Sequence, residues 1–137
     1  MLKSNGENVY LIGAQQEIEI CNFISKHSGA KSLANQTTIP QILELIRNSK
    51  LVITNDSAPT HFASLFNIPT ITIYGSTSPC FGFYPLADKS VSIEDVQLFC
   101  HPCNVHGSEK CPRKSFECMK NITPEIVFKE VKNIIEK

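Results

Sequence analysis

The chain reads Leu51-Val-Ile-Thr-Asn-Asp-Ser-Ala-Pro-Thr-His-Phe-Ala-Ser-Leu-Phe66, and then Ile68-Pro-Thr-Ile-Thr-Ile-Tyr-Gly-Ser-Thr77, over the stretch that decides its fold. The first four residues form a short apolar, β-branched run, which is typical of a strand buried on both faces of a parallel sheet. Polar residues follow, and Pro59 fits the first turn of a helix, where no amide hydrogen is needed. The pattern predicts a strand over residues 51–54, a helix over residues 60–66 and a second strand over residues 70–74.

The turn between this strand and this helix is rich in groups that can hold an anion. The free N–H groups at a helix N-terminus carry partial positive charge, and open α/β sheets usually bind ligands at the carboxyl ends of their strands. Ser57, Thr60 and His61 add hydroxyl and imidazole donors at the same place. The residues alone predict either a site for a phosphorylated ligand or a plain helix-capping turn, because Asp and Ser are also common cap residues.

Strand and helix patterns continue to alternate on both sides of this stretch. The expected strands cover residues 9–12, 33–34, 51–54, 70–74 and 90–93. The expected helices begin after Gly13, with Gly29 as the stop, at Thr38 in the Thr-x-x-Gln form of a capping box, at Thr60, and at Pro124 after the cap residue Thr123. Such alternation favours parallel strands joined by right-handed crossovers. The expected fold class is therefore α/β, with a Rossmann-like parallel sheet and helices on both faces.

Composition limits the compartment and the classes of partner. The 137 residues suit one domain, and 13 basic against 13 acidic side chains give no net charge, so no nucleic-acid partner is expected. The sequence has neither a run of roughly 18 apolar residues nor a signal pattern, so we expect a soluble, cytoplasmic chain. Six cysteines in such a chain are more typical of free thiols or metal ligands than of disulfides.

Three segments of the chain form a signature when they are taken together. They are Asn55-Asp-Ser-Ala-Pro-Thr-His-Phe-Ala63, Asn67-Ile-Pro69 and Tyr74-Gly-Ser-Thr-Ser-Pro79, and their order resembles that of the ADP-heptose:lipopolysaccharide heptosyltransferases, glycosyltransferase family 9. The tail is similar to the end of heptosyltransferase II-like members. Its matching segments are Leu98-Phe-Cys-His-Pro-Cys103, Cys111-Pro112, Cys118-Met119 and Ile122-Thr-Pro-Glu125.

The resemblance implies a GT-B glycosyltransferase, which has two Rossmann-like halves with the active site between them. Residues 1–137 match only the C-terminal, donor-binding half, so we expect one partial domain without the N-terminal acceptor domain. The complete enzyme would transfer heptose from ADP-heptose to the lipopolysaccharide inner core, with inversion and without a cofactor, at the cytosolic face of the inner membrane of a Gram-negative bacterium. A peripheral contact of that enzyme with the membrane stays open. The family keeps its general base in the other half, so we expect no catalytic residue here and no turnover by this chain alone.

Carried over residue by residue, the resemblance places the donor site at Asp56, Ser57, Ala58, Pro59, Thr60, His61, Glu17, Gly13, Thr37 and Thr77. Asp56 would contact the sugar end of the donor, and residues 57–60 would offer amides and hydroxyls to the diphosphate. His61 would contact phosphate or sugar, and Glu17 would accept hydrogen bonds from the ribose hydroxyls. Thr37 would border the adenine, and Thr77 would reach the phosphates.

Each of the main candidates also has a plainer interpretation. Asp56 would simply cap the helix, His61 would be a surface histidine, and Glu17 would be a solvated residue in a helix first turn. Ala58 stands where the family commonly has glycine. Alanine would be strained there if the position needs a positive φ, and harmless if it needs only close approach of the backbone.

Four cysteines of the tail, Cys100, Cys103, Cys111 and Cys118, have three interpretations. They are packing thiols first, then a four-sulfur metal site with His101 and His106 nearby, and then a disulfide or redox pair. The second pair lacks the tight spacing of structural zinc sites, so no metal is assigned. Two other functions stay open: a non-catalytic nucleotide-sugar-binding module or truncated pseudo-enzyme, and a zinc-stabilised interaction domain.

Overall fold

The computed structural model describes residues 1–108 and 110–136. The chain packs as two compact units, Met1–Leu45 and a second unit that begins at Ile46. The first unit holds β1 (Tyr10–Leu11), α1 (Ile18–Ser28), β2 (Lys31–Ser32) and most of α2 (Ile39–Arg47). The second holds β3 (Val52–Asn55), α3 (Ala58–Leu65), β4 (Thr70–Ile73), β5 (Ser90–Ile93), α4 (Glu117–Lys120) and α5 (Pro124–Ile135). Short 3-10 turns cover Lys3–Asn5, Gln15–Glu17 and Pro79–Phe81.

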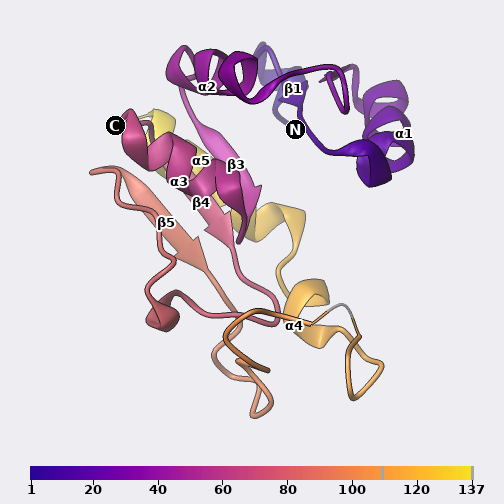
Figure 1. Ribbon diagram of the computed structural model, residues 1–137, viewed down its shortest axis with the longest axis vertical. Helices are drawn as coiled ribbons and strands as arrows, with labels where there is room; N and C mark the ends of the chain where they lie inside the picture. The colour runs from indigo at the N-terminus through magenta and orange to yellow at the C-terminus, as the bar shows by residue number, and fades with distance from the viewer. Residues whose placement is uncertain (109, 137) are drawn as a thin grey trace. The chain divides into compact units, whose positions relative to one another are not determined.

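The sheet of the second unit is parallel, with the strand order β3-β4-β5 (Figure 1). β4 lies in the middle, and Ile71 pairs with Ile53 on one side and with Val91 on the other. α3 packs against β3 and β4, and α5 packs against β4 from behind the sheet in the view of Figure 1. This arrangement confirms the predicted α/β class with parallel strands and with helices on both faces.

The centre of the second unit is built from β4. Thr70, Ile71, Thr72 and Tyr74 are fully buried, and Ala63 of α3 packs with the same core. Three of these five side chains are polar, so the core needs internal hydrogen bonds. The Thr72 hydroxyl is 3.2 Å from the Thr60 hydroxyl across the interface of α3 and β4, and this bond fixes how the helix sits on the sheet.

Loss of the Thr60 hydroxyl should therefore cost more than a surface hydroxyl does. Thr60→Val removes the partner of the buried Thr72 hydroxyl, and we expect it to lower the free energy of unfolding by about 1–3 kcal/mol. In the double variant with Thr72→Val both hydroxyls are absent, so the combined loss should be clearly smaller than the sum of the two single losses. Urea denaturation of the four proteins of this cycle measures the coupling, and strictly additive losses would contradict it.

The first unit contains a short parallel pair, in which Tyr10 lies opposite Lys31. α1 ends where the sequence predicted, because Gly29 takes the left-handed conformation with φ 73°. The capping box before α2 is also confirmed in part, since the Gln41 side chain accepts a hydrogen bond from the Thr38 N–H at 2.8 Å. β2 lies two residues before the expected position, because the ladder to β1 is fixed by bonds such as Lys31 N–H to the Val9 oxygen at 2.9 Å.

Burial differs from the sequence prediction at two places in the second unit. β3 was expected to be buried on both faces, but its burial alternates and Ile53 is 38% exposed. Leu65, at the end of α3, is 70% exposed although it was expected to pack in the core. β3 is one of the two edge strands of the described three-stranded sheet, which leaves part of it uncovered. No helix among the described residues is long and apolar enough to cross a membrane.

Candidate functional site

The turn between β3 and α3 is tied to the neighbouring strand. The Asp56 N–H donates to the Ile73 oxygen at 3.1 Å, so the turn lies at the carboxyl end of β4. Ser57 is the cap residue of α3, with an extended backbone at φ −162°, and its side chain makes no cap hydrogen bond. Its hydroxyl instead donates to the Asn55 oxygen at 3.2 Å and lies 3.1 Å from the Thr54 hydroxyl. The first N–H groups of α3 are thus not covered by a capping side chain.

The geometry decides between two interpretations of Asp56 and of Ala58. Asp56 precedes the cap residue and is not itself the cap, so the plain capping interpretation of this side chain is wrong. Ala58 is the first residue of α3 and is not among the residues with positive φ. The backbone strain that alanine would have at a positive φ is therefore absent at this position. Pro59 lies in the first turn of the helix, as predicted.

The other candidates of this turn differ in how accessible they are. His61 is exposed, and its ring lies edge-on to Phe83 with 6.4 Å between the ring centroids. Thr60 is fully buried, its N–H donates to the Ser57 oxygen at 3.0 Å, and its hydroxyl faces Thr72. Both polar groups of Thr60 are therefore engaged inside the protein, and the accessible groups of the turn are those of Asp56, Ser57 and His61.

Thr77 lies in the loop that follows β4 and is only 8% exposed. The loop is held closely by the tail of the chain. A Cβ atom added at Gly75 would lie 2.5 Å from the Met119 sulfur, and one added at Gly107 would lie 3.2 Å from a methyl carbon of Thr77. A side chain at Gly75 would have to displace the Met119 side chain, and Gly107 has a φ of 77°, which favours glycine.

The remaining predicted site residues, Gly13, Glu17 and Thr37, lie in the first unit. A Glu17 carboxylate oxygen accepts a hydrogen bond from the Ala14 N–H at 2.6 Å, so this side chain folds back over its own turn. A Cβ atom at Gly13 would lie 3.0 Å from the Glu17 Cβ, which explains why glycine stands there. Thr37 is half-buried, just before the start of α2.

Tyr74 is a feature that the sequence prediction missed. Its side chain is fully buried at the end of β4, and its hydroxyl donates to the Phe83 oxygen at 2.7 Å. Burial, and then the negative charge of Asp56, raise the pKa of Tyr74 to about 12. The phenol is therefore neutral at physiological pH and acts as a fixed donor. Its position directly after a buried strand was the available signal.

The sequence prediction also missed the pair formed by His101 and Glu94. The His101 side chain is only 3% exposed, and its Nε2 atom lies 2.9 Å from a Glu94 carboxylate oxygen. The sequence prediction mentioned His101 only as a neighbour of the cysteines. The two residues lie seven positions apart in irregular chain, so no periodic pattern links them.

The cysteines of the tail line one cavity of about 250 Å³, together with Arg113 and Glu117. Burial, and then the charge of Cys103, raise the pKa of the Cys118 thiol. The pKa of the Cys111 thiol is lowered instead, because the Phe116 N–H donates to its sulfur at 3.5 Å. The six cysteines are free in the described structure, and Cys80 and Cys103 are exposed. Within residues 1–108 and 110–136, no group of three or more His, Cys, Asp or Glu side chains is arranged to hold a metal ion.

Comparison with known proteins places this architecture in a family. The model of glycosyltransferase family 9 (heptosyltransferase) matches residues 1–136. A lipooligosaccharide heptosyltransferase 2 of Campylobacter jejuni is 31% identical over 139 residues, which are 97% of this chain and 42% of that protein. A lipopolysaccharide heptosyltransferase 2 of Escherichia coli K12 is 33% identical over 140 residues, 98% of this chain and 39% of that one. The chain spans about two fifths of the length of these relatives.

Two solved structures agree with this result. The structure of E. coli ADP-heptose lps heptosyltransferase II superposes with a TM-score of 0.64 and 27% identity, and covers 88% of this chain and 38% of its own. A family 9 glycosyl transferase from Veillonella parvula superposes with a TM-score of 0.74 over 96% of this chain and 37% of its own. Its identity is 18%, so this second likeness supports the fold alone.

Proposed function

The chain belongs to glycosyltransferase family 9, and from this membership we propose that it is the donor-binding half of a heptosyltransferase, which holds ADP-heptose for transfer to the lipopolysaccharide inner core. One observation carries the proposal. The turn from β3 to α3 lies at the carboxyl end of a parallel sheet, and at the start of α3 the Ala58 N–H group is not covered by a capping side chain. A diphosphate is a ligand that such a helix start attracts.

The side chains around this turn suit the two ends of a nucleotide sugar. Asp56 is half-buried and acceptor-only when ionised, so it would accept hydrogen bonds from sugar hydroxyls. Ser57 and the exposed His61 would donate to phosphoryl oxygens and help to stabilise the charge of the leaving diphosphate. Thr60 serves a different purpose in this proposal, since its hydroxyl holds α3 on the sheet.

The first unit would contribute to recognition of the nucleoside. Glu17 has one carboxylate oxygen on the Ala14 N–H, and its second oxygen would accept from a ribose hydroxyl. Thr37 would border the adenine. Gly13 would act through Glu17, because it leaves the room in which that side chain folds back.

The acceptor sugar and the general base would come from the other half of the enzyme. The proposed partners of the complete enzyme are ADP-heptose or a related nucleotide sugar and the lipopolysaccharide core, with the reaction at the cytosolic face of the inner membrane. The chain by itself would bind the donor weakly and would not turn it over, since the proposal assigns no catalytic residue to it.

Calorimetric titration of the purified chain with ADP and with ADP-heptose tests the proposal. We expect saturable binding of both, and Asp56→Ala should weaken ADP-heptose binding by roughly tenfold or more, because a hydrogen bond to a charged group is lost. ADP binding should change much less, since Asp56 faces the sugar end in this proposal.

The matched control is Glu136→Ala, which removes the same charge from an exposed residue after α5. It should leave both affinities unchanged. A chain with native circular dichroism that binds neither ligand would contradict the proposal. An equal loss of ADP and ADP-heptose affinity in Asp56→Ala would contradict the assignment of Asp56 to the sugar end.

A further inference from the structure

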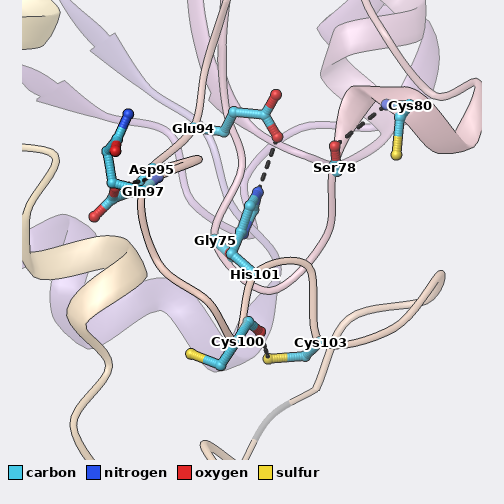
Figure 2. Close-up of polar contacts among 9 residues, drawn as sticks. All are labelled: Gly75, Ser78, Cys80, Glu94, Asp95, Gln97, Cys100, His101 and Cys103. Atoms are coloured by element: carbon cyan, nitrogen blue, oxygen red, sulfur yellow. Dashed lines mark hydrogen bonds and ion pairs between the residues drawn. The ribbon is translucent and has the colours of Figure 1, made fainter.

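The imidazole of His101 is held between two oxygen atoms in the second unit. Nδ1 lies 2.9 Å from the Gly75 carbonyl oxygen, and Nε2 lies 2.9 Å from a Glu94 carboxylate oxygen. Figure 2 shows His101 between these two residues, with Glu94 above the ring and Gly75 beside it. The ring is almost completely buried, so water does not replace either contact.

The nature of the two partners fixes the protons of the ring. A carbonyl oxygen and a carboxylate oxygen are both acceptors, so each ring nitrogen has to donate. Opposite an ionised Glu94, a neutral imidazole has one N–H group and would leave one of the two short contacts without a proton. A flipped ring would turn carbon atoms toward both oxygens and lose both bonds. An imidazolium paired with an ionised Glu94 satisfies both contacts, whereas a neutral ring would do so only if Glu94 kept its own proton and donated it to Nε2.

The neighbouring titratable groups do not compete for this role. The phenol of Tyr74 stays neutral because its pKa is raised to about 12, with burial as the main cause and the charge of Glu94 as a minor one. Asp95 is engaged elsewhere, since its carboxylate accepts from the Asn121 side chain at 2.7 Å and from the Gln97 N–H at 3.2 Å. Cys100 and Cys103 flank His101 in the chain, and the Cys103 thiol donates to the Cys100 oxygen at 3.6 Å.

His101 belongs to a segment that holds the loop after β4 at several points. The Cys103 N–H donates to the Ser76 oxygen at 2.8 Å, and the Ser108 N–H donates to the Ser76 hydroxyl at 3.0 Å. Gly107 packs against the same serine, where an added Cβ atom would lie 3.1 Å from the hydroxyl oxygen. Among these contacts, the one from His101 alone carries charge, and it joins the end of β4 at Gly75 to the end of β5 at Glu94.

We propose that His101 is a positioning residue: as an imidazolium between Gly75 and Glu94, it pins the loop of residues 75–79 to the carboxyl edge of the sheet. In this proposal, the contacts of residues 100–108 determine the conformation of the loop. That the loop borders the nucleotide sugar, through Thr77 and the adjoining β3–α3 turn, rests on the proposed function. The protonation state and the pinning rest on the contacts of His101 alone.

The Glu94→Gln variant tests the proposed protonation state of His101, because glutamine has nearly the same shape as glutamate but no charge. A glutamine amide can donate to Nε2, so a neutral His101 with its proton on Nδ1 would satisfy all contacts. Nitrogen-15 spectra of the labelled chain at about pH 8, where exposed histidines are mostly neutral, report the state of each ring. We expect both His101 nitrogens to be protonated in the wild type and one in Glu94→Gln, with His61 and His106 as internal references for exposed rings.

Asp95→Asn is the matched control, because it removes the same charge one residue further along the chain. It should leave His101 doubly protonated. A neutral His101 in the wild type, or a ring that stays doubly protonated in Glu94→Gln, would overturn the proposal. A Glu94→Gln effect on the loop without a change of the ring would also overturn it, since the effect would then be merely structural.

Loop position is read from the amide signals of Ser76 and Thr77, which should move in Glu94→Gln and stay in Asp95→Asn. Loss of the charged contact between His101 and Glu94 should also lower the affinity for ADP-heptose by roughly three- to tenfold. The two proposals fail separately. If the wild-type chain has a doubly protonated His101 but binds no ADP-heptose, the donor-site function is rejected and the positioning role of His101 stands. If the chain binds the donor but His101 is neutral, the positioning role of His101 is rejected and the donor-site function stands.

Discussion

Replacing Ile71 with alanine is expected to lower the free energy of unfolding by roughly 2–5 kcal/mol, the largest loss from any single side chain considered for this protein. Ile71 is fully buried in β4, the central strand of the second unit, with paired residues on both sides. Truncation removes apolar surface from the core and leaves a cavity that the flanking strands cannot fill. A loss of this size is a large fraction of the stability of an ordinary domain.

Ile53→Ala is the control for this prediction. Ile53 lies directly opposite Ile71 on β3, but it is 38% exposed, so alanine there should cost clearly less. Denaturant titration followed by circular dichroism measures both variants against the wild type. Equal losses would mean that β3 is covered on its open face in solution, against the alternating burial of that strand.

The stability of the second unit should fall steeply at alkaline pH because of Tyr74. The pKa of Tyr74 is raised from 10.0 to about 12 in the folded chain, mainly by burial. Between these two values the unfolded chain loses the phenol proton while the folded chain keeps it. The stabilisation is therefore complete below pH 10 and is lost as pH rises through about 12. A shift of this size corresponds to at most about 2–3 kcal/mol.

Tyr74→Phe should remove this part of the pH dependence. At neutral pH the same variant should cost about 1 kcal/mol, because the Phe83 oxygen loses its donor. Tyr84, which is 48% exposed, gives the control variant Tyr84→Phe, and it should keep the alkaline loss. Denaturation midpoints measured across this pH range distinguish the two. An alkaline loss that persists in Tyr74→Phe would show that other groups cause it.

Much of the candidate site was predictable from the sequence, since it depends on local patterns. A polar turn between two β-branched runs predicted the β3–α3 turn, a helix from residue 60 and a strand over residues 70–74; the observed elements are Ala58–Leu65 and Thr70–Ile73. The helix end at Gly29 follows from the backbone freedom of glycine. The family signature over residues 55–79 could be recognised for the same reason, because its residues are close together in the chain.

The local patterns were less informative about which groups face inward. Thr60 was assigned to the ligand by its position in the turn, yet its hydroxyl faces Thr72, 12 residues further along the chain. Leu65 was assigned to the core because it is apolar, yet nothing described in the structure covers it. Burial depends on neighbours that are distant in sequence, and periodicity does not report them.

The sequence by itself determined the alternation of strand and helix, the parallel sheet and the family, since each of these rests on residue order and backbone preference. Only the tertiary structure decided the two contacts of His101, the raised pKa of Tyr74 and the burial of Thr60. The His101 contacts arise where the ends of β4 and β5 meet the tail of the chain, and Thr60 is buried between α3 and β4. Water is excluded there, and each donor needs an acceptor that the fold brings from another element.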